Sequence, residues 1–336
     1  MAKIVLGLGT SHGPLLGTPP EQWDQRVLAD KAHPGHPFRG GTYTFDELVK
    51  LRASENLAEQ SSLPMRKKRF EACQGHIATL AKAFAETKPD VAVIIGNDQM
   101  EVFNDINIPT FAVYYGDKIE NIPFTEQQKA NQAPGMALSE RNHHGANLEI
   151  YPGLPKLGMH FIKSLMDANF DVASSKELPQ TGPEFSGIPH AYGFVYKRIM
   201  GEHVVPSVPV FVNTFYPPNQ PGAPRCFNMG VELAKAIQAW DEDVRVAVIG
   251  SGGLSHFAID EEFDYAFMDA MRQADAKKLT EFPDHLYRSG TSEMKNWIPL
   301  AGVMMHAGLK MDMLEYVPCY RSEAGTGNGM GFARWH

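Results

Sequence analysis

Four short, continuous apolar runs bounded by Gly, Asn or Pro divide the chain, and a fifth run resembles them. Apolar runs of this length without polar alternation predict strands that are buried on both faces of a sheet. The predicted strands cover residues 3–9, 90–98, 108–116, 208–215 and 244–253. Stretches with apolar residues on one helical face precede three of them, at 66–88, 156–170 and 228–243. This alternation predicts one α/β/α layered domain over residues 1–336, built around a mostly parallel sheet.

Polar, glycine-rich loops follow four of the predicted strands. Sheets of this class carry their functional groups at the carboxyl ends of the strands. The loops are "GTSHGP" (9–14), "GNDQMEVF" (96–103), "NTFYPPNQ" (213–220) and "GSGGLSH" (250–256). We therefore expect a site where these four loops meet.

Two long polar insertions, at 18–64 and 117–152, interrupt the pattern. Connections of this length are typical of lids or oligomer contacts, and plain solvated surface is the other interpretation. The last segment, 321–336, is rich in glycine but keeps Phe332 and Trp335. We expect this tail to pack near the site.

Composition narrows the possible function classes. Hydrophobic residues make up 43% of the 336 residues, enough for a sizeable core, and the net charge of −8 with scattered Lys and Arg argues against nucleic-acid or polybasic membrane binding. No apolar run reaches the roughly 20 residues of a spanning helix, and the first residues lack a signal-peptide pattern. The three cysteines, Cys73, Cys226 and Cys319, are far apart and odd in number, which argues against a disulfide framework or a cysteine zinc site. We expect a cytoplasmic enzyme with no nucleic-acid or membrane partner, and a homo-oligomer.

Histidines and one glutamate are the candidate catalytic groups. His256 follows Gly250, Gly252 and Gly253 at a strand end, where glycines allow a sharp turn, so we interpret it as an acid/base. A serine nucleophile is the weaker hypothesis because the GxSxG elbow is absent around Ser255. Glu293 lies in a predicted helix start.

In chain order, the motifs resemble the class III extradiol ring-cleavage dioxygenases, the superfamily that contains the catalytic subunit of protocatechuate dioxygenases. The similar segments run from residue 4 to about 305 and include "GTSHGP", "KPDVAVIIGNDQMEVFND", "IPHAYGF", "VAVIGSGGLSH" and "GTSEMKNW". The resemblance implies non-haem Fe(II) at the carboxyl edge of the sheet, with His12 and Glu293 as ligands. It implies His256 as the acid/base, His190 as a histidine that either supports the metal ligands or faces the substrate, and a hydroxylated aromatic substrate together with O2.

One position departs from the family pattern. Gln99 stands where the resemblance implies a second histidine ligand, and an amide oxygen binds Fe(II) more weakly than imidazole. Three hypotheses follow: Gln99 is a ligand; another residue replaces it; or iron is lost and the protein is a metal-dependent hydrolase or lyase, or a small-molecule-binding protein. The replacement candidates are Asp98, His33, His36, His143 and His144.

Substrate contacts are expected from two further places. His36 and Arg39 of the first insertion are candidates for binding a substrate carboxylate or phenolate. Asn213, Thr214 and Tyr216 of the loop after the fourth run are candidates for the pocket rim.

Overall fold

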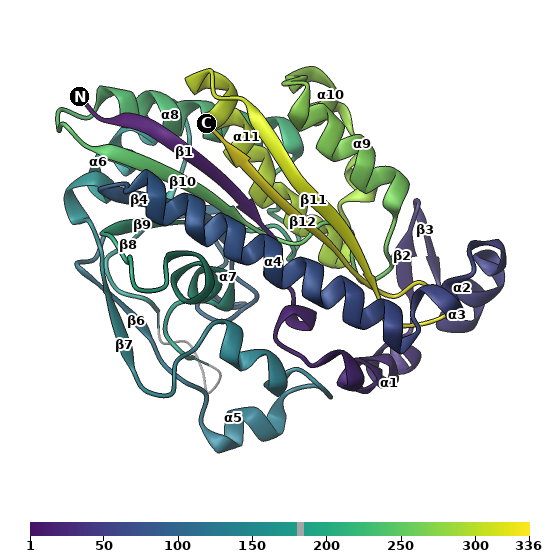
Figure 1. Cartoon of the computed structure of the whole chain (residues 1–336). Helices are drawn as coiled ribbons and strands as arrows, with labels where there is room; N and C mark the ends of the chain where they lie inside the picture. The colour runs from purple at the N-terminus through teal and green to yellow at the C-terminus, as the bar shows by residue number, and fades with distance from the viewer. Residues whose placement is uncertain (180–184) are drawn as a thin grey trace.

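The computed structural model describes residues 1–179 and 185–336, and these form an eight-stranded sheet with helices on both faces (Figure 1). The strand order is β11-β12-β1-β10-β4-β9-β5-β8. The strands are β1 (Lys3–Thr10), β4 (Val91–Asn97), β5 (Phe111–Tyr114), β8 (Ala173–Ser175), β9 (Ser207–Val212), β10 (Arg245–Ser251), β11 (Met311–Tyr320) and β12 (Gly327–Trp335). All five predicted strands are present, which confirms the α/β class.

Four central strands are mutually parallel. β1 pairs with β10, β10 with β4, and β4 with β9, all in parallel register. Their carboxyl ends therefore meet at one edge of the sheet, as the strand-end loops predict. β5 lies antiparallel to β9, so the sheet is mostly rather than wholly parallel.

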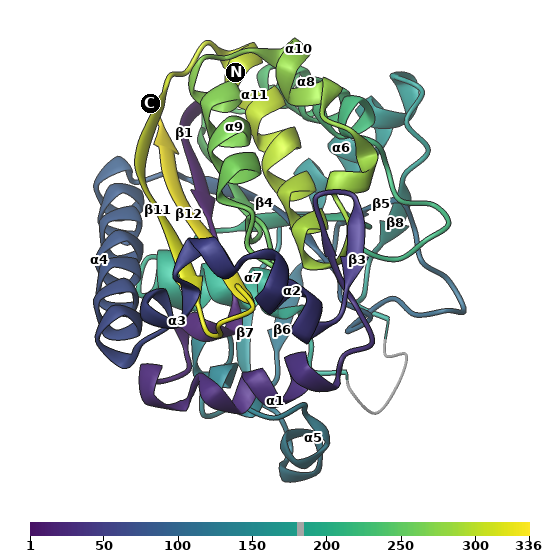
Figure 2. The same ribbon diagram turned by 90° about the vertical axis from the view of Figure 1, so that its right-hand side faces the viewer.

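The two faces of the sheet carry two separate apolar cores. Within β4, Val91, Val93 and Ile95 join one core while Ala92 and Ile94 join the other. The first core packs against α6 (Pro155–Asp167), α8 (Ala223–Ala239), α9 (Glu261–Arg272) and α11 (Trp297–Ala307). The second core packs against α4 (Leu63–Thr87) and α7 (His190–Phe194). Figure 2 shows the resulting layers, with α4 on one side of the sheet and α9 and α11 on the other. No helix within the described ranges is long and apolar enough to cross a membrane.

The glycine-rich tail is part of the sheet. β11 and β12 form an antiparallel hairpin, and β12 pairs antiparallel with β1. No strand is predicted there from the apolar pattern, because glycine weakens strand propensity. The glycines admit close neighbours instead: a Cβ at Gly331 would lie 2.9 Å from Leu254 Cδ1. Trp335 is buried in the first core.

Both insertions fold beside the carboxyl edge of the sheet (Figure 1). The first contains α1 (Asp24–Ala32), β2 (His36–Phe38), β3 (Gly41–Tyr43), α2 (Phe45–Leu51) and α3 (Leu57–Gln60). The second contains β6 (Lys118–Asn121), α5 (Glu126–Asn131) and β7 (Glu149–Pro152). A short helix, α10 (Ala276–Glu281), follows α9.

Candidate active site

A cavity of about 460 Å³ opens at the carboxyl edge of the sheet. Its volume is within the usual range for small-molecule sites. Five of the sequence-predicted site residues line it: His12, Gln99, His190, His256 and Glu293. They come from five separate stretches of the chain, so the fold brings them together.

His12 follows β1 and presents one ring nitrogen to the cavity as an acceptor. Its Nδ1 lies 2.9 Å from Ser251 Oγ, and this hydroxyl donates its single proton to the Ala191 carbonyl at 2.7 Å. His12 Nδ1 must therefore be the donor, which leaves a lone pair on Nε2. That Nε2 is buried without a hydrogen-bond partner and lies 3.3 Å from Glu293 Oε2. Burial lowers the pKa of His12, which favours this neutral form.

His256 has the same kind of fixed tautomer. Its Nδ1 lies 2.7 Å from the Leu254 carbonyl, which can only accept, so Nδ1 carries a proton and, in the neutral ring, Nε2 carries the lone pair. This Nε2 is 3.7 Å from Glu293 Oε1. Two glycines make room for the ring: a Cβ at Gly290 would lie 2.0 Å from His256 Cδ2, and one at Gly253 2.7 Å from Cε1.

Glu293 lies between these two histidines, in a 3₁₀ segment (Ser289–Asn296) that leads into α11. Its Oε2 accepts from the Gly253 N–H at 2.8 Å, and its Oε1 accepts from Gln99 Nε2 at 3.2 Å. Burial raises the pKa of the carboxyl, but the positive charge that His12 and His256 carry when protonated outweighs burial and holds that pKa well below its usual range. Glu293 is therefore a buried carboxylate.

His12, Glu293 and Gln99 together fit a metal ion, with the Gln99 amide as the unusual ligand. Adjacent ligands of a metal with bonds of about 2.1 Å lie about 3 Å apart, and the 3.3 Å between His12 Nε2 and Glu293 Oε2 is close to this value. Over the described ranges, no three His, Cys, Asp or Glu side chains form a metal-binding group, so a third protein ligand beside His12 and Glu293 would have to be of another type, such as the Gln99 amide. The oxygen and nitrogen of an amide are assigned from its hydrogen bonds. A reversed Gln99 amide would place its oxygen beside Glu293 as a third ligand.

His190 and Glu101 form a partly buried ion pair on the cavity wall. The Glu101 carboxylate accepts from the backbone N–H of His190 at 2.9 Å, and it also pairs with Nδ1 of the His190 ring. Burial lowers the pKa of His190, but Glu101 outweighs it and raises that pKa to about 9. The ring is thus an imidazolium at neutral pH, and its centroid lies 4.8 Å from that of His12. Glu101 is missed from sequence, although "GNDQMEVF" places it two residues after Gln99.

The other side chains proposed from sequence as the third metal ligand in place of Gln99 lie in different places relative to the cavity. Asp98 does not line the cavity; its carboxylate accepts from the backbone N–H groups of residues 101, 102 and 103. His33 is exposed, and His36 Nε2 bonds the Asp30 carbonyl. His144 is buried outside the lining, whereas His143 lines the cavity with an unpartnered Nε2. Gln99 and His143 are therefore the only two of these side chains that face the cavity.

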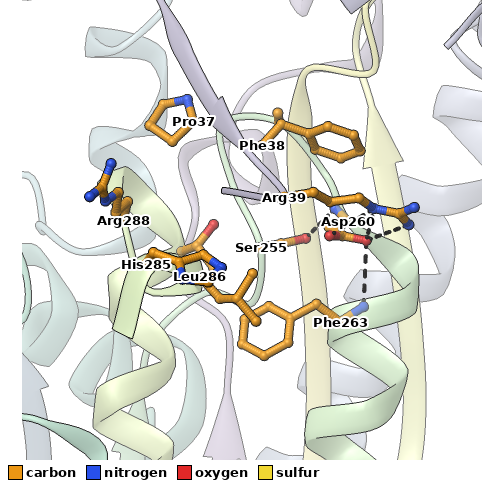
Figure 3. A pocket seen from close by; sticks show the side chains of 11 residues that line it. Pro37, Phe38, Arg39, Ser255, Asp260, Phe263, His285, Leu286 and Arg288 are labelled. Atoms are coloured by element: carbon orange, nitrogen blue, oxygen red, sulfur yellow. Dashed lines mark hydrogen bonds and ion pairs between the residues drawn. The ribbon is translucent and has the colours of Figure 1, made fainter. Parts of the chain in front are cut away.

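The structure places the predicted substrate-binding residues away from the cavity. Figure 3 shows Arg39 bound to Asp260 in a separate, smaller pocket, with Nη2 and Oδ1 2.8 Å apart. The Asn213 side chain forms hydrogen bonds with the backbone of Tyr216 in the same turn. Asn213, Thr214 and Tyr216 do not line the cavity. From that turn Phe215 lines it instead. Both insertions contribute further lining residues that sequence reasoning missed, which are Arg26, Phe124, Gln132, Met136 and Ser139.

Comparison with known proteins identifies the family of the chain. The sequence profile of the family described as catalytic LigB subunit of aromatic ring-opening dioxygenase matches residues 57–327, a span that includes Gln99 and Glu293 but not His12. Gallate dioxygenase of Pseudomonas putida is 26% identical over 166 residues, which are 45% of this chain and 46% of that protein. The 2,3-dihydroxyphenylpropionate/2,3-dihydroxicinnamic acid 1,2-dioxygenase of Comamonas testosteroni is 22% identical over 251 residues, 74% of this chain and 55% of that protein. The chain thus spans about half the length of these curated relatives. It belongs to the family of the catalytic LigB subunit of aromatic ring-opening dioxygenases.

Proposed function

We propose that the protein is an Fe(II)-dependent extradiol-type dioxygenase that opens the ring of a catechol-like compound or a hydroxylated heteroaromatic compound. The observation that carries the proposal is the pair of fixed imidazole lone pairs, on His12 and His256, that face the buried Glu293 carboxylate. Family membership supports the reaction class. His12, Glu293 and the Gln99 amide would hold the metal.

Each residue around this centre has a role that follows from its hydrogen bonds. The chemistry that iron supplies in such a three-ligand site is binding of both catechol oxygens and O2 at adjacent open positions. His256 can accept the proton of a substrate hydroxyl at Nε2, because its Nδ1 proton is held by the Leu254 carbonyl. The His190 imidazolium, paired with Glu101, presents positive charge to a bound catecholate and orients it.

Metal analysis with a Gln99→His variant tests this proposal. We expect near-stoichiometric iron in anaerobically purified natural protein, and O2 uptake when catechols are added. Because imidazole is the stronger ligand, the variant should bind Fe(II) at least about tenfold more tightly, a gain of about 1.4 kcal/mol. Natural protein that neither holds iron nor consumes O2, beside a variant that does hold iron, would contradict the proposal.

Gln99 also favours a second candidate function. With a weak third ligand, the same pocket could serve a metal-dependent hydrolase or lyase, or a small-molecule-binding protein. The discriminating result is protein that binds Zn(II) or no metal and consumes no O2 with any catechol of the panel.

A further inference from the structure

Arg26 is a buried cation on the wall of the same cavity. Arg26 lies in α1 of the first insertion, lines the cavity, and is 7% exposed. Nη1 donates to the Pro134 carbonyl at 3.2 Å, and Nε is buried without a hydrogen-bond partner. Within the described part of the chain, no carboxylate forms an ion pair with this guanidinium. Burial and the neighbouring Arg321 lower the pKa of Arg26 to about 10, so it stays charged at neutral pH.

The nearest acidic residue on its own helix is already neutralised. Asp30 lies one turn after Arg26, and both of its oxygens accept from Arg321, at 2.6 and 2.7 Å. Thr326 Oγ1 donates to the same carboxylate. Asp30 is thus paired with Arg321 and only raises the pKa of Arg26 from a distance, and among the described residues no carboxylate pairs directly with Arg26. A buried unpaired charge is costly unless a ligand supplies its partner.

The surroundings also hold the guanidinium in place. Gly135, at φ +79°, packs its backbone over the side chain, since a Cβ there would lie 3.2 Å from Arg26 Cδ. The Pro134 carbonyl accepts from one nitrogen of the fork, and the residue lines the cavity. A guanidinium of this kind matches the planar, two-oxygen geometry of a carboxylate.

We propose that Arg26 binds the carboxylate of an aromatic substrate and so orients the ring toward His12, Glu293 and His256. This inference rests on the proposed function and assigns to Arg26 the role that the sequence suggested for Arg39. Arg26 lies in the first insertion, before the span that the family profile matches. The substrate class is then a carboxylated catechol.

Calorimetric binding under anaerobic conditions tests the inference with three probes: benzoate, 3,4-dihydroxybenzoate and catechol. Loss of a charged hydrogen-bonding partner should weaken binding of the two carboxylates by about ten- to a hundredfold in Arg26→Gln. Catechol binding should change less than about twofold. Arg26→Lys keeps the charge without the fork and should recover part of the loss. Arg39→Gln is the matched control and should bind all three probes as the natural protein does.

Folding and function are separated by two further measurements. Thermal unfolding of Arg26→Gln and Arg26→Lys identifies a variant that is merely unfolded, and a folded variant with unchanged affinity for benzoate overturns the inference. Natural protein that does not bind benzoate also overturns it. Benzoate has no hydroxyl groups for the metal, so its binding does not depend on iron or O2. Oxygen uptake by natural protein with 3,4-dihydroxybenzoate and catechol tests the proposed function independently.

Discussion

At the scale of single residues, His256 is the group whose position most constrains the chemistry. Leu254 accepts from its Nδ1, Gly290 leaves room for its ring, and its Nε2 lies 3.7 Å from Glu293 Oε1. In His256→Ala we expect unchanged metal content, because His12, Gln99 and Glu293 remain. Turnover should fall by about 10²- to 10⁴-fold, the usual contribution of a positioned acid/base.

Iron content by elemental analysis and O2 uptake at saturating catechol measure the two expectations for His256 separately. Turnover close to that of the natural protein would exclude the acid/base role. Loss of the metal together with turnover would instead make His256 a ligand.

The residues of the site differ in how far sequence could predict them. His12, Gln99, His256 and Glu293 follow or face the ends of parallel strands, so the strand pattern and the resemblance together predict their meeting. Arg26 could not be found in this way. It lies in a polar helix of an insertion, where its charge is typical of a solvated surface, and only the packing of the 134–136 turn buries it.

At the scale of elements, the apolar pattern predicts strands well where each strand is buried by its own side chains. β1, β4, β9 and β10 are of this kind. β12 contains three glycines among nine residues, and it is buried because neighbouring side chains approach its backbone closely. A local pattern of apolar residues does not contain that information, nor the reversed direction of β5 relative to β9.

The loop after β4 is an element held by one carboxylate. Asp98 accepts three backbone N–H groups, at 3.0, 3.0 and 2.7 Å, and the first of these belongs to Glu101, the partner of His190. Asp98→Ala leaves buried donors unsatisfied, so we expect the free energy of unfolding to fall by about 2–4 kcal/mol. Asp98→Asn keeps one acceptor and should lose less.

Urea denaturation measures both Asp98 variants, and Asp105→Ala is the control because Asp105 is exposed in the same loop. The control should stay within about 0.5 kcal/mol of the natural protein. An Asp98→Ala protein as stable as the control would show that this carboxylate does not hold the loop.

At the scale of the whole molecule, the cavity depends on contacts between segments that are far apart in the chain. α1 of the first insertion is joined to the end of the C-terminal hairpin by the Asp30–Arg321 pair, whose side chains are 5% and 0% exposed. Breaking a buried pair leaves an uncompensated charge. Asp30→Asn should therefore lower the free energy of unfolding at pH 7 by about 3–5 kcal/mol. Asp24→Asn, on the exposed start of the same helix, should change it by less than about 1 kcal/mol.

The stabilisation by the Asp30–Arg321 pair should depend on pH. Burial opposes ionisation of Asp30, but Arg321 outweighs it and lowers the pKa of the carboxyl. A lowered folded-state pKa means that the pair's stabilisation is complete above the ordinary aspartate value of about 3.9 and is lost as the pH falls through the folded-state pKa. Urea denaturation from pH 7 to pH 3 should therefore show a constant gap between natural protein and Asp30→Asn above about pH 4, and a shrinking gap below it. A gap that widens toward low pH would mean that Asp30 is protonated in the folded protein, and α1 would then need another contact to hold it against the hairpin.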